Sequence, residues 1–65
     1  MFNKAKFKAK VIEKGLTMEC IAHELGINQA TLYRKMNGSS DFFRTEIQTL
    51  CVLLDITNPI EIFFA

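Results

Sequence analysis

Side chains able to recognise nucleic-acid bases occur close together between Gln29 and Arg34. A glutamine amide can form two hydrogen bonds with adenine, an arginine guanidinium can form two with guanine, and a small side chain such as that of Ala30 can contact the thymine methyl group. Ala30 and Arg34 are four residues apart and would therefore share one side of a helix. This chemistry favours contact with the major groove of DNA, and the alternative is an ordinary solvated helix face.

The flanking residues predict two short helices separated by a turn at Gly26. Thr17 and Asn28 are residue types whose side-chain oxygen accepts a free backbone N–H at the start of a helix. Apolar pairs with the spacing of a hydrophobic staple flank both caps: Leu16 with Ile21, and Ile27 with Leu32. Neither helix is long enough to be stable alone, so both must pack against the rest of the chain.

Helical periodicity divides the side chains of this region into an inward and an outward set. The inward set is apolar and consists of Ile21, Ala22, Leu25, Ile27, Leu32 and Met36. The outward set belongs to the second helix and consists of Gln29, Ala30, Thr31, Tyr33, Arg34 and Lys35. The second helix is therefore expected to have one side for the core and one side for a ligand.

The pattern L-T-x-x-x-I-A-x-x-L-G-I-x-x-x-T-L-Y-R-x-x-N-G, which runs from Leu16 to Gly38, resembles the helix-turn-helix of the phage lambda-type repressor and Cro family. The resemblance covers essentially the whole chain, because that family's domain has about this length, with one helix before the motif and two after it. It implies a sequence-specific, double-stranded DNA-binding transcriptional regulator, a repressor or Cro-like protein, that acts by occupying an operator. A palindromic operator and a weak homodimer or DNA-assisted dimer would go with it.

The resemblance and the residue chemistry together assign roles to individual side chains. The residues expected to read bases are Gln29, Ala30, Tyr33 and Arg34. The residues expected to contact the DNA backbone are Thr17, Asn28, Thr31, Lys35, Asn37, Ser39 and Arg44.

Four positions depart from the family's pattern. The family often carries Gln at the position of Met18, where its amide donates to a phosphate, so Thr17 and backbone N–H groups would have to compensate. The family's ion pair between the first helix and the recognition helix is replaced by apolar Val11 and Met36, an exchange that can be neutral when both partners change together. Lys35 occupies a commonly apolar place, which predicts a slight rotation of the helix end, with Met36 filling the core instead.

The whole sequence predicts an all-α fold, a compact bundle of five short helices in a single domain over residues 1–65. The expected helices span about 3–14, 17–24, 28–36, 44–55 and 59–64. Asn3 caps the first helix and Gly15 ends it, whereas Asn58 and Pro59 begin the fifth as cap and first helical residue. No segment has the alternating pattern of a strand.

The longest expected connection runs from Ser39 to Phe43. Serine hydroxyls and backbone N–H groups in such a loop are of the kind that bind phosphate oxygens. Asp41 would repel phosphate, so we expect it to cap or turn the chain locally. One of Phe42 and Phe43 is expected to fill the core beneath the loop.

The C-terminal segment is almost continuously apolar. Core packing accounts for most of these side chains, and the alternative for the remainder is a self-association surface. The possible dimer contact consists of Val52, Phe63 and Phe64.

The net charge of +1 hides an asymmetry along the chain, because every basic residue precedes Thr45. The acidic residues after it are Glu46, Asp55 and Glu61. This order predicts a molecule with a basic end and an acidic end, which would steer a duplex to one face. The lysines of the first helix cannot all share one face, so they serve solubility or, for Lys4 and Lys8, phosphate contact.

Composition argues against several other classes of protein. Cys20 and Cys51 are expected to be free thiols, Cys20 near the surface and Cys51 in the core. Together with the single His23, which is expected on the surface, they cannot form an ordinary zinc site.

We expect no metal, cofactor or small-molecule ligand and no enzyme activity, because the chain has no acid/base cluster or phosphate-binding Gly loop. No apolar run approaches the roughly 20 residues that span a membrane, and the expected location is the cytoplasm.

A second interpretation keeps the fold but makes the chain a protein-interaction module, such as an antirepressor that binds another regulator. The low net charge and the loss of the phosphate-binding amide at Met18 favour it. Its partner would bind the end that carries Val52, Phe63 and Phe64.

Overall fold

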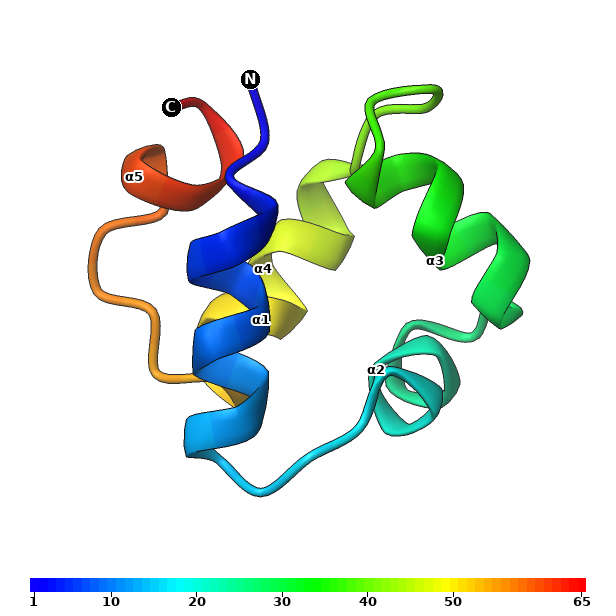
Figure 1. Ribbon diagram of the computed structural model, residues 1–65, viewed down its shortest axis with the longest axis horizontal. Coiled ribbons are helices and arrows are strands. Elements are labelled where there is room, and N and C mark those ends of the chain that lie inside the picture. Colours follow the sequence, from blue (N-terminus) through cyan, green and yellow to red (C-terminus); the bar gives the residue numbers. More distant parts are fainter.

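The computed structural model describes all residues from 1 to 65 and contains five α-helices and no strands (Figure 1). The helices are α1 (Lys4–Glu13), α2 (Met18–Leu25), α3 (Gln29–Met36), α4 (Arg44–Leu53) and α5 (Ile60–Phe63). The predicted all-α fold of five short helices is therefore confirmed. None of the helices combines the length and the apolar character that crossing a membrane requires.

Three helices begin at the caps expected from the sequence. The side-chain oxygens of Asn3, Thr17 and Asn28 each accept the backbone N–H three residues later, with distances of 3.0, 3.2 and 2.7 Å. Each bond satisfies a donor that the first turn of a helix leaves free. Local sequence thus sets where α1, α2 and α3 start.

The C-terminal end of α4 and the start of α5 differ from expectation, whereas α4 begins at Arg44 as expected. Helix α4 stops at Leu53 rather than Asp55, because Asp55 adopts a left-handed backbone with φ of 52° that no helix interior accommodates. Helix α5 begins at Ile60, one residue after the expected start, with Pro59 in the N-cap position and no side-chain cap. Asn58 contributes only its carbonyl oxygen, which accepts from the Glu61 N–H at 3.3 Å.

The core draws apolar side chains from every helix. Its fully buried members include Phe7 of α1, Ile21 of α2, Leu32 of α3 and Leu50 of α4. Helix α5 contributes Phe63, whose exposed fraction is 7%. Of the predicted inward set, Leu25 and Ile27 are half-buried and the other four are buried. The residues that would replace the family's ion pair, Val11 and Met36, both lie in this core.

The loop after α3 closes the core from one side. Phe42 packs its ring against those of Phe2 and Phe63, with centroids 5.0 and 5.5 Å apart, whereas Phe43 remains exposed. Aromatic rings at such separations contribute directional stabilisation beyond their buried area. The prediction that one of these two residues fills the core is confirmed, and the residue is Phe42.

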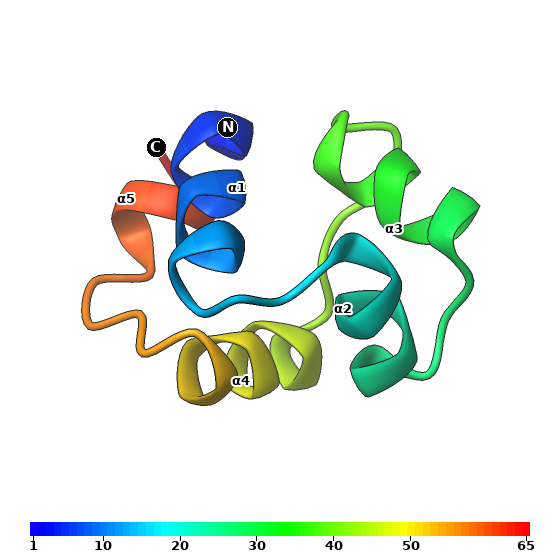
Figure 2. The ribbon, with the colours of Figure 1, turned by 60° about the horizontal axis from the view of Figure 1, so that its bottom comes forward.

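Helices α1 and α5 pack together on one side of the molecule, and α3 lies on the other (Figures 1 and 2). Helix α2 contacts both α3 and α4 and so joins α3 to the rest of the core. Because α3 lies at an edge, one side of it faces the core and the opposite side is left uncovered.

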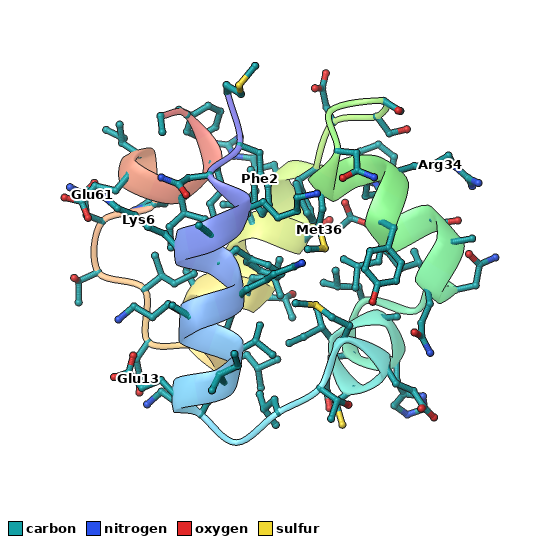
Figure 3. All side chains as sticks on the ribbon, in the orientation of Figure 1. Phe2, Lys6, Glu13, Arg34, Met36 and Glu61 are labelled. Carbon is teal, nitrogen blue, oxygen red and sulfur yellow. The ribbon has the colours of Figure 1, made fainter.

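The predicted separation into a basic end and an acidic end is wrong. The chain folds back so that Lys6 and Glu61 lie on the same edge, far from Arg34 (Figure 3). Lys14 forms an ion pair with Asp55, and Lys35 forms one with Glu46. Charge order along a sequence does not determine charge order in space when the two termini pack together.

Candidate nucleic-acid interface

A tight turn of three residues connects α2 to α3. Gly26 ends α2 in the left-handed conformation with φ of 69°, which costs glycine little. The Ile27 N–H donates back to the Ala22 carbonyl oxygen at 3.0 Å, and Asn28 then caps α3. Short hydrogen bonds on both sides of the turn therefore fix the angle between the two helices.

The uncovered side of α3 carries the four residues expected to read bases. Gln29, Ala30 and Arg34 are exposed, and Tyr33 is 40% exposed. Gln29 and Ala30 occupy the first turn of the helix, and the Arg34 side chain extends away from the molecule (Figure 3). This surface is free to meet a ligand.

Arg34 is held by its own helix. Its guanidinium donates a hydrogen bond to the Thr31 hydroxyl at 3.0 Å, and the Thr31 side chain is half-buried. A guanidinium has five N–H donors, so most of them stay available after this bond. Thr31, expected to contact the DNA backbone, thus has a clear structural role in orienting Arg34.

Asn37 and Lys4 come together although they are distant in sequence. The Lys4 ammonium donates to the Asn37 side-chain oxygen at 2.7 Å, which joins the first turn of α1 to the C-terminal end of α3. Two of the three ammonium hydrogens and the Asn37 amide N–H groups remain for an anion. Sequence reasoning proposed phosphate contact for each residue but had no signal that would pair them.

Four more of the residues expected at the DNA backbone, Thr17, Asn28, Ser39 and Arg44, are exposed. Thr17 and Asn28 already use their side-chain oxygens as helix caps. Ser39 is held by its own N–H, which donates to the Arg34 carbonyl oxygen at 2.9 Å, and its hydroxyl is free of hydrogen bonds within the chain. Arg44 is the first residue of α4 and has no acidic partner within ion-pair distance.

The assignment of Lys35 to the outward set and to the DNA backbone is wrong. Its side chain is 5% exposed, and its ammonium lies 2.9 Å from the Glu46 carboxylate and 3.9 Å from the centre of the Phe43 ring. Lys35 follows Leu32 by three residues and therefore shares its inward side of the helix. Because Met36 is buried as well, the end of α3 has a wider inward side than the pattern predicted.

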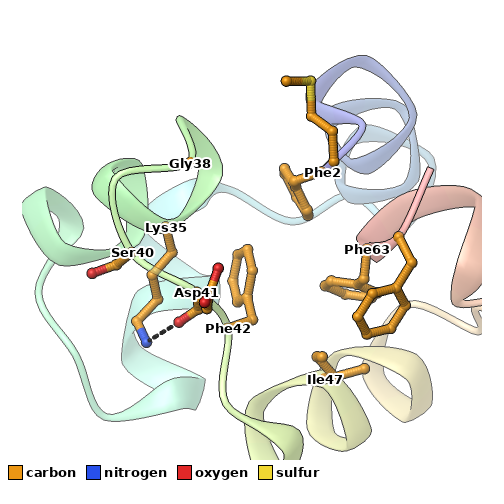
Figure 4. Close-up of a pocket in the computed structure, with 10 residues that line it drawn as sticks. Phe2, Lys35, Gly38, Ser40, Asp41, Phe42, Ile47 and Phe63 are labelled. Carbon is orange, nitrogen blue, oxygen red and sulfur yellow. Dashed lines mark hydrogen bonds between the residues drawn. The ribbon is translucent and has the colours of Figure 1, made fainter.

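A cavity of about 590 Å³ lies between the N-terminal residues, the loop after α3 and α5 (Figure 4). The rings of Phe2, Phe42 and Phe63 form part of its walls, with Lys35 and Asp41 at one side. Phe63 is buried, so its assignment to a dimer contact is wrong.

The two other residues of the expected dimer contact are exposed but lie apart. Val52 is 80% exposed and borders a shallow hollow with Glu24 of α2, whereas Phe64 is 63% exposed and borders the aromatic cavity. No single patch therefore combines the three side chains.

The thiols and the histidine form no joint site. Cys20 and His23 are exposed, and Cys51 is half-buried; both thiols are free. Burial raises the pKa of the Cys51 thiol, which further disfavours the reactive thiolate. No three His, Cys, Asp or Glu side chains are grouped so that they could hold a metal ion.

No protein-family model, curated protein or solved structure was found to match this chain. The resemblance of the Leu16–Gly38 pattern to the lambda-type repressor and Cro family therefore stays a prediction. The function of α3 and its neighbours has to be inferred from their chemistry and geometry.

Proposed function

We propose that this protein is a sequence-specific, double-stranded DNA-binding transcriptional regulator, and that α2 and α3 form its helix-turn-helix. Helix α3 would enter the major groove, where Gln29, Ala30 and Arg34 contact base edges and Tyr33 lies beside them. The protein would repress by occupying an operator and excluding polymerase.

The uncovered side of α3 is the observation that carries this proposal. A helix with its side chains is about 10–12 Å across, and the major groove is about 12 Å wide. Helix α3 lies at the edge of the molecule, and its exposed residues have hydrogen-bonding and methyl-contacting groups. The N-terminal residues of a recognition helix are those that reach base edges, and here they are Gln29 and Ala30.

Cationic side chains and N–H donors close to α3 support the same placement of α3 in the major groove. Lys4 joins Asn37 at one end of α3, and Arg44 follows the loop that begins there. Such groups position a protein on the phosphate backbone without reading sequence. The proposal therefore separates base contacts on α3 from backbone contacts around it.

We propose that two copies bind a palindromic operator with little direct contact. The molecule extends 25 × 25 × 20 Å, and half-sites on successive turns of the duplex are about 34 Å apart. Two copies on one face would touch at most at their edges, which fits a weak or DNA-assisted dimer.

Fluorescence anisotropy with random-sequence duplexes at low salt tests the first step. A DNA-binding protein should show measurable affinity that falls steeply as salt is added, because bound cations displace counterions from the duplex. In vitro selection of bound duplexes then tests sequence specificity, with enrichment of an inverted repeat as the expected result. Absence of salt-sensitive binding would contradict the proposal.

A protein-interaction module is the second candidate function. Exposed apolar side chains at α5 favour it: Ile60 and Phe64, four residues apart, are 64 and 63% exposed. If the selection enriches no duplex and anisotropy shows no binding, substitutions of these residues that abolish capture of another regulator would support this candidate.

A further inference from the structure

The Lys35 ammonium is completely occupied by groups of its own chain. It donates to the Glu46 carboxylate at 2.9 Å and to the Asp41 carbonyl oxygen at 3.1 Å, and the Phe43 ring covers it at 3.9 Å from the centroid. An ammonium has three N–H donors, so a carboxylate, a carbonyl and an aromatic face account for all three. Its charge is not available to a ligand.

Lys35 and Glu46 also make the main polar attachments of the loop after α3, which consists of residues Ser39 to Phe43. From Ser40 to Phe43, no backbone N–H donates to another backbone group. Apart from the Phe43 carbonyl, which accepts the Ile47 N–H of α4 at 3.0 Å, two side-chain attachments hold this backbone. The Asp41 carbonyl accepts from Lys35, and the Phe43 N–H donates to Glu46 at 2.8 Å. Figure 4 shows the first of these, beside the Phe42 ring that anchors the loop to the aromatic cluster.

The attachments leave a row of unused donors. The backbone N–H groups of Ser40, Asp41 and Phe42 have no partner within the chain, and Ser39 and Ser40 add exposed hydroxyls. The exposed Asp41 carboxylate lies among them and opposes a phosphate, so the serine hydroxyls and the flanking N–H groups have to provide the contact. N–H groups and hydroxyls of this kind bind phosphate oxygens. Their usefulness depends on the loop keeping one conformation, because ordering a mobile loop at the moment of binding reduces affinity.

We infer that Lys35 and Glu46 are positioning residues, which hold the Ser39–Phe43 loop so that its free donors meet the DNA backbone. The inference rests on the proposed function and replaces the direct phosphate contact expected for Lys35. A buried ion pair is weak evidence for stability, since apolar replacements of both partners are often neutral or stabilising. Its distinct contribution here is to the conformation of the loop.

The double variant Lys35→Met/Glu46→Leu separates this role from stability. It removes both attachments without leaving a buried charge, so its melting temperature should fall only by the few degrees that the lost capping bond at the start of α4 accounts for. Its affinity for all duplexes should fall roughly tenfold, because the loop would then have to be ordered at the moment of binding. The salt slope should stay unchanged, because no phosphate-binding cation is removed. Nitrogen-15 relaxation should show faster motion of the Ser40–Phe42 amides.

A matched control is Lys14→Met/Asp55→Asn, which removes the ion pair between α1 and the end of α4 with the same change in charge. Its DNA affinity and the relaxation of the loop should match the wild type. If Lys35→Met/Glu46→Leu does not fold, Lys35→Met/Glu46→Gln replaces it, because glutamine still offers an acceptor to the Phe43 N–H.

The outcomes distinguish the inference from the proposed function. Wild-type affinity in the double variant would overturn the positioning role, and a salt slope reduced by about one would instead place Lys35 on a phosphate. A wild-type protein without any affinity for DNA would overturn the proposed function itself. In that case unchanged loop relaxation in the double variant would also show that the pair does not hold the loop.

Discussion

Arg34 and Lys35 are adjacent in sequence, but their charged groups have opposite environments. The guanidinium of Arg34 extends from the surface with one hydrogen bond to Thr31, whereas the ammonium of Lys35 is buried against Glu46. Successive residues of a helix point about 100° apart, so a single step along α3 crosses from the free side to the core. Individual side chains, not the overall charge of the helix, therefore decide which contacts it can make.

Substitution of two arginines should separate base contact from backbone contact. Arg34→Ala should relax base preference at one operator position, at a cost of about 1–3 kcal/mol, whereas Arg44→Ala should weaken binding to all sequences alike and reduce the salt slope by about one. Competition binding against single-base operator variants measures both effects. An equal loss on every sequence for Arg34→Ala would remove it from the base-reading set.

Lys4 should contribute to affinity although it belongs to α1. Lys4→Met removes the cation beside Asn37 and should reduce the salt slope by about 0.9, the value for one neutralised phosphate. Lys6→Met is the matched control, since Lys6 lies on the edge with Glu61 and away from Arg34 (Figure 3). Salt titrations of the two variants measure the slopes, and equal slopes would contradict the phosphate contact of Lys4.

The orientation of α3 depends on the turn that precedes it. Gly26 is left-handed, the Ile27 N–H returns to α2, and Asn28 caps α3 within two residues. Each is a local interaction, so the turn should form the same angle whenever α2 and α3 pack on the core.

Replacement of Gly26 should therefore affect stability through the backbone alone. A Cβ at this position would meet no atom within 4 Å, so the cost of Gly26→Ala comes from the positive φ and should be about 1 kcal/mol. Gly26→Asn should cost less, because asparagine tolerates this conformation. Urea unfolding measures both, and equal stabilities of the two variants would show that φ is not the cause.

At the scale of the whole molecule, contacts between distant segments join the two ends of the chain. Phe2 near the N-terminus packs against Phe42 and Phe63, and Lys14 after α1 pairs with Asp55 after α4. These contacts enclose the core and place α1 beside α5. One of these contacts, the exposed Lys14–Asp55 ion pair, depends on pH.

The Lys14–Asp55 pair should make a small contribution to stability, reduced by solvent screening, that is lost at both extremes of pH. Its hydrogen bond, reinforced by charge attraction, lowers the pKa of Asp55 and raises the pKa of Lys14. The Asp55 contribution is therefore present above the unfolded-chain pKa of about 3.9 and lost as pH falls through the lower folded value. The Lys14 contribution is present below about 10.4 and lost as pH rises through the higher folded value. Thermal unfolding from pH 2 to 12 should show both declines, and Asp55→Asn should reduce the difference between neutral pH and either extreme.

The sequence by itself determined the elements that depend on neighbouring residues. The caps at Asn3, Thr17 and Asn28 were predictable because each side chain bonds to a backbone group only three residues away. The exposed residues of α3 followed from the same local periodicity, apart from its last turn. The end of α4 was less predictable, since aspartate adopts the left-handed conformation of Asp55 only occasionally and its residue type is a weak signal.

Only the tertiary structure decided which distant residues meet. Glu46 lies eleven positions after Lys35, and Asn37 lies 33 positions after Lys4, so no spacing rule connects them. The burial of Phe63 and the mixing of basic and acidic segments follow from the packing of α5 on α1. A buried ammonium is acceptable only where a carboxylate and other acceptors converge on it, and that convergence arises when the loop folds over α3.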